Sequence, residues 1–277
     1  MSQLTFEQLL DAGVHFGHLK RRWNPAFAPY IYGEKNGVHI IDLNKTLAKL
    51  DEACNILKNL AKQNKKILFV ATKKQAKEII ESKVKPLGMP YVVERWPGGL
   101  LTNFSTIRKS IKRMYQIEKM ETDGTFEKIS KKERLLLTRE KAKLQKQFGS
   151  IADMNRLPSA LFIIDIVKEH IAVKEAKRLN IPTFAMVDTN SNPNEVNYPI
   201  PANDDAATSI DIILTAVCNA IAEGLAERGS DNISNEKAEK FEDETSTISK
   251  KYETVVEGEE ETETTKKPRG RKRIVKK

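Results

Sequence analysis

The sequence predicts an α/β fold in which helices cover both faces of a parallel β-sheet. Four short apolar runs and a still shorter fifth alternate with stretches of helical periodicity, which is typical of parallel strands joined by helices. The runs show no polar alternation, as expected for strands buried on both faces. Charged residues make up 31% of the 277 residues and apolar residues only 39%. This balance indicates that part of the chain lies outside a packed core.

Each expected element has a local signal. The expected strands are residues 67–72, 91–93, 161–165, 183–187 and, more briefly, 198–200. The expected helices around them are residues 47–60, 74–84, 171–179 and 205–227. Asp42 or Asn44 is the expected cap of the first of these helices. Before them we expect a short helix capped by Thr5, an irregular aromatic loop, and a hairpin of residues 30–32 and 38–41.

The α/β alternation is interrupted between residues 103 and 155. Apolar residues recur there at helical spacing in two stretches, and Asp123-Gly124 marks a turn between them. This pattern predicts an inserted antiparallel helical hairpin. Residues 103–149 hold 13 basic and 6 acidic side chains, a net +7 out of the +9 of the whole chain. Either this charge binds a polyanion or it is the solvated face of a coiled coil.

The last 48 residues have a different composition. Residues 230–277 hold 12 acidic and 12 basic side chains, first an acidic stretch and then KKPRGRKRIVKK. They lose periodicity and nearly all large apolar residues, which predicts disorder. The expected organisation is therefore an α/β domain of residues 1–102 and 156–229, an inserted hairpin of residues 103–155, and a disordered tail of residues 230–277.

Several classes of protein are disfavoured by the sequence. Two cysteines, Cys54 and Cys218, give no disulfide framework, which fits a reducing compartment. The first residues do not have the pattern of a signal peptide. Polar residues interrupt the most apolar window, residues 210–222, which is too short to span a bilayer. We therefore expect a basic cytoplasmic protein with no membrane partner.

The basic residues of the body favour nucleic acid as the partner. Lys20, Arg21 and Arg22 precede Trp23 in the aromatic loop, where cations hold phosphates and an indole stacks on an unpaired base. The alternative for Trp23 is burial in the core. Lys73 and Lys74 stand at a strand-to-helix turn, which also favours phosphate.

Arg95, Trp96, Gly98 and Gly99 follow a later strand, and paired glycines permit close approach of an RNA backbone. A plain tight turn is the alternative there. No motif for reading duplex DNA occurs, so DNA is not an expected partner.

Two further interpretations concern the carboxyl edge of the sheet. An α/β enzyme acting on a phosphorylated small molecule is the rival function, but no phosphate-binding loop follows the first strand. His18, Asp188 and Asp204 form a candidate site for a divalent ion, because Asp188 ends a strand and Asp204 precedes the last helix. The alternative is that Asp204 or Asp205 caps that helix. We expect no cofactor to be required.

The same residues resemble a known family. AGVHFGHLKRRWNPAFAPYIYGEKNGVHIIDLNKT (residues 12–46), RWPGGLLTNFSTIRKSIKR (95–113) and EHIAVKEAKRLNIPTFAMVDTNSNPNEVNYPIPANDDA (169–206) are similar to segments of the universal small ribosomal subunit protein two family in its bacterial form. The resemblance covers about residues 5 to 228. It implies a flavodoxin-like domain with a protruding coiled-coil hairpin.

The resemblance also implies a function. It points to a non-enzymatic constituent of the small (30S) subunit, bound in the cytoplasm to 16S rRNA and neighbouring ribosomal proteins, and docking ribosomal protein one. Transferred position by position, it implies RNA contacts for His15, His18, Arg21, Arg22, Trp23 and Asn24, and weaker ones for Lys73, Lys74, Arg95, Trp96, Gly98, Gly99 and Asn103. Asn192 stands where some relatives carry an acidic residue, which weakens the metal site of His18, Asp188 and Asp204.

Overall fold

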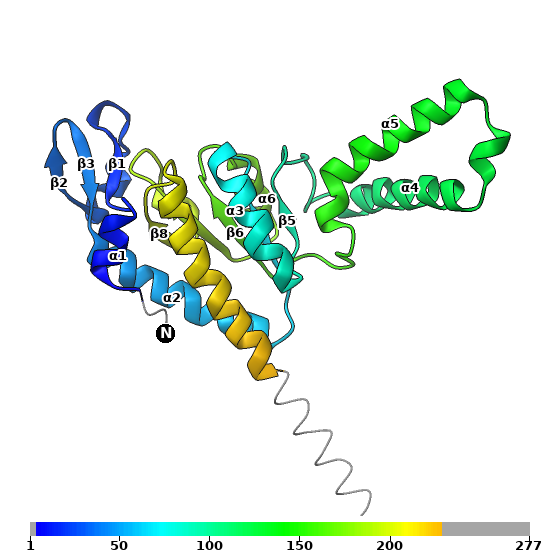
Figure 1. The fold of residues 1–277 in the computed structure, drawn as a ribbon. Helices are drawn as coiled ribbons and strands as arrows, with labels where there is room; N and C mark the ends of the chain where they lie inside the picture. The colour runs from blue at the N-terminus through cyan, green and yellow to red at the C-terminus, as the bar shows by residue number, and fades with distance from the viewer. Residues whose placement is uncertain (1–3, 229–277) are drawn as a thin grey trace, which may run out of the picture. The chain divides into compact units, whose positions relative to one another are not determined.

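Five parallel strands form the central sheet of the computed structural model, which describes residues 4–228 apart from the side chains of residues 127 and 128 (Figure 1). The strands are β4 (Ile67–Val70), β5 (Tyr91–Val92), β6 (Ala160–Ile164), β7 (Thr183–Val187) and β8 (Tyr198–Pro201). Their order is β5-β4-β6-β7-β8. The second strand in the chain thus lies outside the first, and the later strands extend the other side, which is the flavodoxin-like order. The predicted α/β class with a parallel sheet is confirmed.

Alternate side chains of each strand supply two cores. Ile67 and Phe69 of β4 pack with the first core, whereas Leu68 and Val70 pack with the second. The first core also contains the apolar faces of α2 (Leu43–Lys62), α3 (Lys74–Val84) and the C-terminal helix (Ala207–Arg228). The second contains α6 (His170–Arg178), the aromatic loop and the base of the helical hairpin. Both faces of the sheet are therefore covered, which explains the uninterrupted apolar strands.

The C-terminal helix is longer than the apolar window predicted. Its 22 residues are long and apolar enough to cross a membrane by length and composition, so the expectation that this segment is too short is wrong. Burial of this helix in the protein core also accounts for its apolar composition. Ile213, Leu214 and Val217 are fully buried in the first core, and 56% of the most apolar window of the helix is buried within the protein. We conclude that its apolar residues serve this domain.

The N-terminal residues form a helix and a small separate sheet. Helix α1 (Phe6–Asp11) has a capping box between Thr5 and Gln8, as a cap at Thr5 predicts. Strands β2 (Ile31–Lys35) and β3 (Val38–Ile41) form the expected hairpin. A third strand, β1 (Phe16–Leu19), pairs with β3 where an irregular loop is expected. The short 3-10 helices η1 (Lys20–Arg22) and η2 (Pro25–Tyr30) connect β1 to β2.

The interrupted region forms two packed helices that extend away from the sheet (Figure 1). Helix α4 (Phe104–Thr122) and helix α5 (Lys131–Phe148) are joined by η4 (Thr125–Lys128), and η5 (Gly149–Ile151) leads back to the sheet. Ser130 caps α5 by accepting a hydrogen bond from the backbone N–H of Glu133. Arg113 Nε lies 3.3 Å from Glu140 Oε1, and Lys141 Nζ lies 2.6 Å from Glu121 Oε2. Ion pairs between the helices therefore use part of the hairpin's positive charge.

Other expectations about the fold remain predictions. Coiled-coil side-chain packing in α4 and α5 stays a prediction, as does the division of the chain into three parts. The predicted disordered tail, residues 230–277, lies outside the described residues. Two further 3-10 helices complete the elements, η3 (Lys85–Leu87) and η6 (Pro193–Glu195).

Candidate functional site

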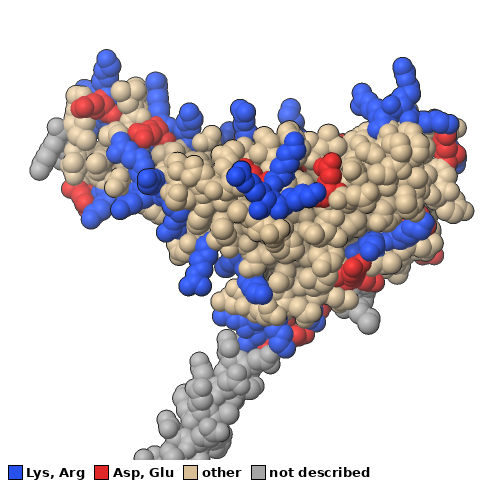
Figure 2. Space-filling view, turned by 180° about the vertical axis from the view of Figure 1, so that it is seen from behind, with Lys and Arg blue, Asp and Glu red and all other residues tan. Residues whose placement is uncertain are grey.

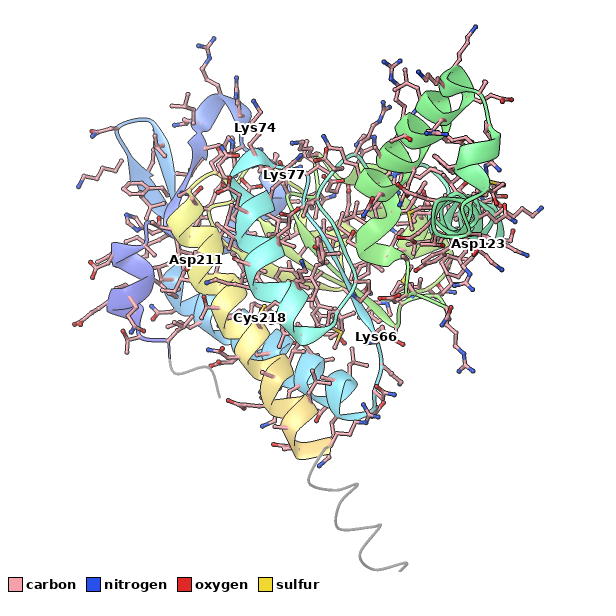
Figure 3. The ribbon with its side chains drawn as sticks, turned by 45° about the vertical axis from the view of Figure 1, so that its right-hand side comes forward. Lys66, Lys74, Lys77, Asp123, Asp211 and Cys218 are labelled. Atoms are coloured by element: carbon pink, nitrogen blue, oxygen red, sulfur yellow. The ribbon has the colours of Figure 1, made fainter. Side chains whose placement is uncertain are left out.

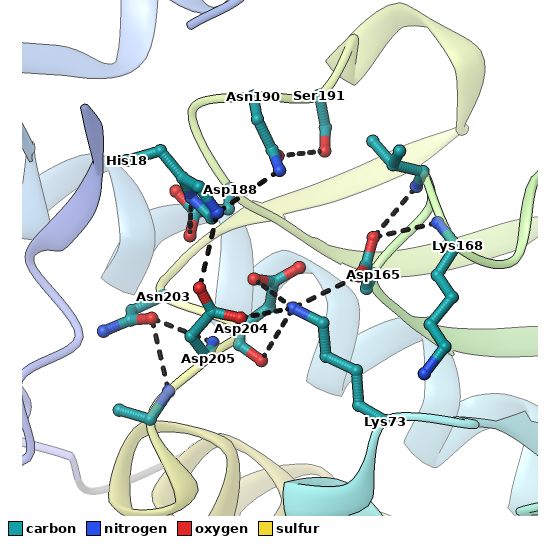
Figure 4. Close-up of polar contacts among 12 residues, drawn as sticks. His18, Lys73, Asp165, Lys168, Asp188, Asn190, Ser191, Asn203, Asp204 and Asp205 are labelled. Atoms are coloured by element: carbon teal, nitrogen blue, oxygen red, sulfur yellow. Dashed lines mark hydrogen bonds and ion pairs between the residues drawn. The ribbon is translucent and has the colours of Figure 1, made fainter. Parts of the chain in front are cut away.

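Side chains that follow the parallel strands meet at the carboxyl edge of the sheet (Figure 4). Lys73 follows β4, Asp165 follows β6, and Asp204 and Asp205 follow β8. The Lys73 Nζ atom lies 3.1 Å from Asp165 Oδ2, 2.8 Å from Asp204 Oδ1 and 2.8 Å from Asp205 Oδ1. The ammonium of Lys73 is thus surrounded by carboxylates, and it is not available to an RNA phosphate.

Burial and charge act on Lys73 and Asp204 together. Burial lowers the pKa of Lys73, but the carboxylates of Asp204, Asp205 and Asp165 outweigh it, so that the pKa lies above its ordinary value. Burial raises the pKa of Asp204, and the nearby carboxylates of Asp188 and Asp165 raise it further. The Oδ2 atom of Asp204 is buried without a hydrogen-bond partner, which adds to the cost of ionising this carboxyl.

His18 connects the N-terminal sheet to the same edge. Its Nδ1 atom lies 2.9 Å from Asp188 Oδ2, and its Nε2 atom lies 3.3 Å from Asp205 Oδ2. The hydrogen bond to Asp188 raises the pKa of His18 against the opposing effect of burial. The backbone N–H of His18 donates to Thr189 Oγ1 at 2.8 Å. A Cβ atom on Gly17 would lie only 2.5 Å from Thr189 Cγ2, so β1 packs tightly against the loop that follows β7.

The candidate metal ligands need a correction. The ligand atoms of His18, Asp188 and Asp205 lie within 4.8 Å of one another, whereas Asp204 does not belong to this group. Asp204 instead bonds to Lys73. One imidazole nitrogen and two carboxylate oxygens fit a divalent ion such as zinc, which takes such ligands. Asn203 Oδ1 accepts from the backbone N–H groups of Asp205 and Ala206 in the turn that leads into the last helix, and a cap by Asp204 or Asp205 stays a prediction.

A second cluster holds the loop between β5 and α4. Glu175 of α6 is buried, and its Oε1 atom accepts from the Trp96 indole at 3.1 Å and from the Gly99 backbone N–H at 2.7 Å. Its Oε2 atom accepts from the backbone N–H groups of Leu101 and Thr102 at 3.0 and 3.1 Å and from the Thr102 hydroxyl at 3.2 Å. One carboxylate therefore fixes the whole loop.

This cluster corrects the expectation for Trp96. The indole is only 5% exposed and packs in the second core, so Trp96 does not offer a surface for stacking on a base. Gly99 has a φ of +84°, a conformation that favours glycine, while Gly98 is exposed with open space around its Cα. Arg95 and Asn103, at the two ends of the loop, are exposed.

The aromatic loop presents its arginines to solvent. Arg21 and Arg22 of η1 are exposed and form no ion pair within residues 4–228, whereas Lys20 pairs with Glu34 at 2.9 Å. Trp23 is half-buried, and its ring lies 5.1 Å from that of His39. The Asn24 side chain caps η2 by accepting from the Ala26 backbone N–H. Arg21 and Arg22 are thus the exposed cations of this loop that have no ion-pair partner among the described residues.

His15 and Lys74 complete the predicted set. His15 is half-buried, and burial together with the nearby charge of Lys35 lowers its pKa. Its Nδ1 atom is buried without a hydrogen-bond partner. Lys74 is exposed at the start of α3 (Figure 3). Lys74 therefore remains accessible where its neighbour Lys73 does not.

Comparison with known proteins identifies the family. Residues 9–224 match the model of the ribosomal protein S2 family. The chain belongs to this family. The small ribosomal subunit protein uS2 of Parabacteroides distasonis is 64% identical over 239 residues, 86% of each chain. The protein of the same name from Porphyromonas gingivalis is 65% identical over 228 residues, 82% of this chain and 81% of the relative. That of Azobacteroides pseudotrichonymphae is 61% identical over 241 residues, 87% of this chain and 92% of the relative.

Family membership confirms the expected class. The ribosomal protein S2 family is a family of structural ribosomal proteins and not of enzymes, so the chain is a ribosomal protein, located on the ribosome in the cytoplasm. The structure agrees with this at the carboxyl edge, where α/β enzymes bind their ligands. Lys73 and its three carboxylate partners occupy that edge and form ion pairs with one another.

The sequence analysis did not single out Asp165 or Glu175. Asp165 had a signal, since it directly follows an apolar strand and parallel strands collect polar side chains at this edge. Glu175 had none beyond its position on the apolar face of α6, next to Ala172 and Ala176 in the helical repeat. A carboxylate on a buried helix face requires a partner, but its partner loop is more than 70 residues away.

Proposed function

We propose that the chain is a structural constituent of the small ribosomal subunit that binds 16S rRNA and neighbouring ribosomal proteins. The observation that carries the proposal is the contrast between two sets of cations. Lys73 is neutralised inside the protein, while Arg21, Arg22 and Lys74 are exposed and have no ion pair in the described residues. Exposed unpaired arginines suit phosphate contacts, which dominate affinity for nucleic acid.

The RNA-contacting residues that we propose follow from exposure. They are Arg21, Arg22, Lys74, Arg95, Gly98 and Asn103, with His15, His18, Trp23 and Asn24 in partly buried supporting positions. Lys73 and Trp96 leave the set because their polar atoms are used within the protein. Gly99 has a structural part instead, since its backbone N–H donates a hydrogen bond to the Glu175 carboxylate.

The hairpin supplies further cations to this function. Lys109, Lys112, Lys131, Lys132, Arg139 and Lys143 are exposed and make no ion pair among the described residues. Because α4 and α5 extend from the sheet, these side chains reach RNA that the body does not contact (Figure 1).

We further propose that the small N-terminal sheet docks ribosomal protein one, because apolar side chains are exposed on it. Phe16 is 50% and Tyr32 81% exposed on the small sheet, which suits a protein partner better than an RNA strand.

We propose that no cofactor is required. Lys73 supplies the positive charge that Asp165, Asp204 and Asp205 need, so the edge is held together without a metal. A divalent ion offered to the protein is expected to bind at His18, Asp188 and Asp205, whose ligand atoms lie within 4.8 Å of one another.

A salt series tests the proposal. The full chain is mixed with 16S rRNA, and the dissociation constant is measured by filter binding at increasing salt concentration. We expect a linear log–log dependence with a slope of about −0.7 to −0.9 per phosphate contacted. An affinity that does not change with salt contradicts the proposal.

A further inference from the structure

A groove at the opposite, amino edge of the sheet is lined by cations. Because β4, β5 and β6 are parallel, the connections that enter them meet at one edge. A groove of about 870 Å³ there is lined by residues 63–66, 85, 88–91, 145, 149–150, 153–157 and 159. We call it the amino-edge groove. None of the residues that the sequence predicted to contact RNA lines it.

The positive charge of the amino-edge groove is largely free. Lys65, Lys85 and Arg156 are exposed and form no ion pair within residues 4–228. Lys66 is held at the rim, where its Nζ atom donates to the Gly88 carbonyl at 2.8 Å. Asp153 is the one carboxylate among the described residues of the lining. Four cations thus face a single acidic side chain.

The two edges of the sheet therefore differ in charge. At the carboxyl edge Lys73 is surrounded by aspartates, so its charge is neutralised within the protein. At the amino edge the cations outnumber the carboxylates, and Lys65, Lys85 and Arg156 form no ion pair among the described residues. Figure 3 shows Lys66 far from Lys74 and Lys77, which lie at the other end of α3. Figure 2 shows that lysines and arginines also outnumber carboxylates on the face seen from behind.

We propose that the amino-edge groove binds the phosphodiester backbone of an RNA strand. The inference rests on the proposed function and adds a second contact surface to it. Three connections contribute cations along a groove near the upper end of the range for ligand pockets, which suits an extended polyanion. A small phosphorylated ligand requires instead a convergent cradle of backbone N–H groups, and no glycine-rich phosphate loop occurs among these connections.

The test compares two triple variants of the full chain. The groove variant is K65A/K85A/R156A. The control variant, K174A/K177A/R178A, removes the same charge from exposed positions of α6 that do not line the groove. Binding to 16S rRNA is measured over a salt series, and thermal unfolding shows whether each variant is folded. We expect the groove variant to lose at least tenfold in affinity and its slope to fall by about 2, since each lost phosphate contact removes about 0.7 to 0.9.

The outcomes separate the two proposals. A groove variant with the same slope and affinity as the control variant overturns this inference, even if the unmodified chain binds RNA. A groove variant that loses a protein partner but keeps its RNA affinity also overturns it. An unmodified chain with no salt-dependent RNA binding overturns the proposed function as well. If the triple variant does not fold, the single variants K65A, K85A and R156A are each expected to lower the slope by about 0.7 to 0.9.

Discussion

Glu175 accepts the indole N–H of Trp96 at 3.1 Å, across 79 positions of the sequence. The same carboxylate accepts hydrogen bonds from the backbone of Gly99, Leu101 and Thr102. This contact joins α6 to the loop that leads into the helical hairpin. Trp96, which the sequence predicted to contact RNA, therefore helps to hold the base of the helical hairpin in place.

Glu175→Gln is expected to destabilise the fold. The amide has one acceptor oxygen in place of two, and its NH₂ group faces N–H donors of the loop. We expect a loss of about 2 kcal/mol in the free energy of unfolding, the range for hydrogen bonds to a charged group. Urea unfolding measures it. Glu78→Gln, at an exposed position of α3, is the control and is expected to change stability by less than about 0.5 kcal/mol. Equal effects of the two substitutions contradict the role of Glu175.

The contribution of Glu175 is expected to depend on pH. Burial raises its pKa, but the hydrogen bonds from Gly99, Trp96, Thr102 and Leu101 outweigh burial and hold the pKa below its ordinary value of 4.5. A carboxyl with a lowered pKa in the folded state stabilises above its unfolded pKa and loses that contribution as the pH falls through the folded pKa. The stability difference between the unmodified chain and Glu175→Gln is therefore constant above about pH 5.5 and shrinks below pH 4.5. Urea unfolding at a series of pH values measures this difference, and one that grows on acidification contradicts the argument.

Lys73→Met is expected to be costly. It leaves Asp165, Asp204 and Asp205 at one edge without their shared counter-ion. Removing one partner of a buried ion pair costs about 3 to 5 kcal/mol. Lys74→Met removes the same charge one residue away at an exposed position and is expected to leave stability within about 0.5 kcal/mol. Calorimetry of both variants distinguishes them, and unchanged stability of Lys73→Met would show that its ion pairs are dispensable.

Chelation is expected to leave the fold intact. Since Lys73 neutralises the carboxyl edge, removal of divalent ions with EDTA does not shift the melting temperature of the purified chain. Added zinc is expected to raise it in the unmodified chain and not in His18→Gln, because binding to the folded state stabilises that state. A melting temperature that falls on chelation contradicts the proposal that no cofactor is required.

Arg21 and Arg22 are expected to act on RNA binding and not on stability. The double variant R21A/R22A removes two exposed, unpaired cations of η1. We expect the log–log salt slope for 16S rRNA to fall by about 1.4 to 1.8 at an unchanged melting temperature. Lys20→Ala is a useful comparison because Lys20 pairs with Glu34. A slope that stays at the value of the unmodified chain excludes both arginines as phosphate contacts.

The elements that the sequence predicts well are those decided by burial. Strands β6 and β7 are buried at every position and almost wholly apolar because both faces of the sheet are covered, so their runs stand out. Strand β1 does not stand out. Its residues Phe16–Leu19 include Gly17 and His18, which are half-buried, while Phe16 and Leu19 are exposed. The strand forms because it pairs with β3 and because Thr189 Oγ1 accepts the His18 backbone N–H, and these partners are distant in the sequence.

The candidate site shows the same limit. The rule that parallel strands collect polar side chains at their carboxyl ends correctly places Asp188 there, and the expected neighbour His18 of β1 lies next to it. It does not tell an ion pair from a metal ligand, and only the coordinates place Asp205 with His18 and Asp204 with Lys73. Similarly, composition alone does not tell an indole that stacks on RNA from one that is buried. For Trp96 the decision depends on Glu175, whose pairing no local pattern encodes.

Sedimentation of a cell lysate through a sucrose gradient in Mg²⁺ buffer tests the central claim most directly. The chain is followed by immunoblot across the gradient. Our account predicts that nearly all of it migrates with the 30S and 70S particles and shifts to lighter fractions when the salt concentration is raised. A predominantly free pool near 31.4 kDa contradicts the proposed role in the small subunit.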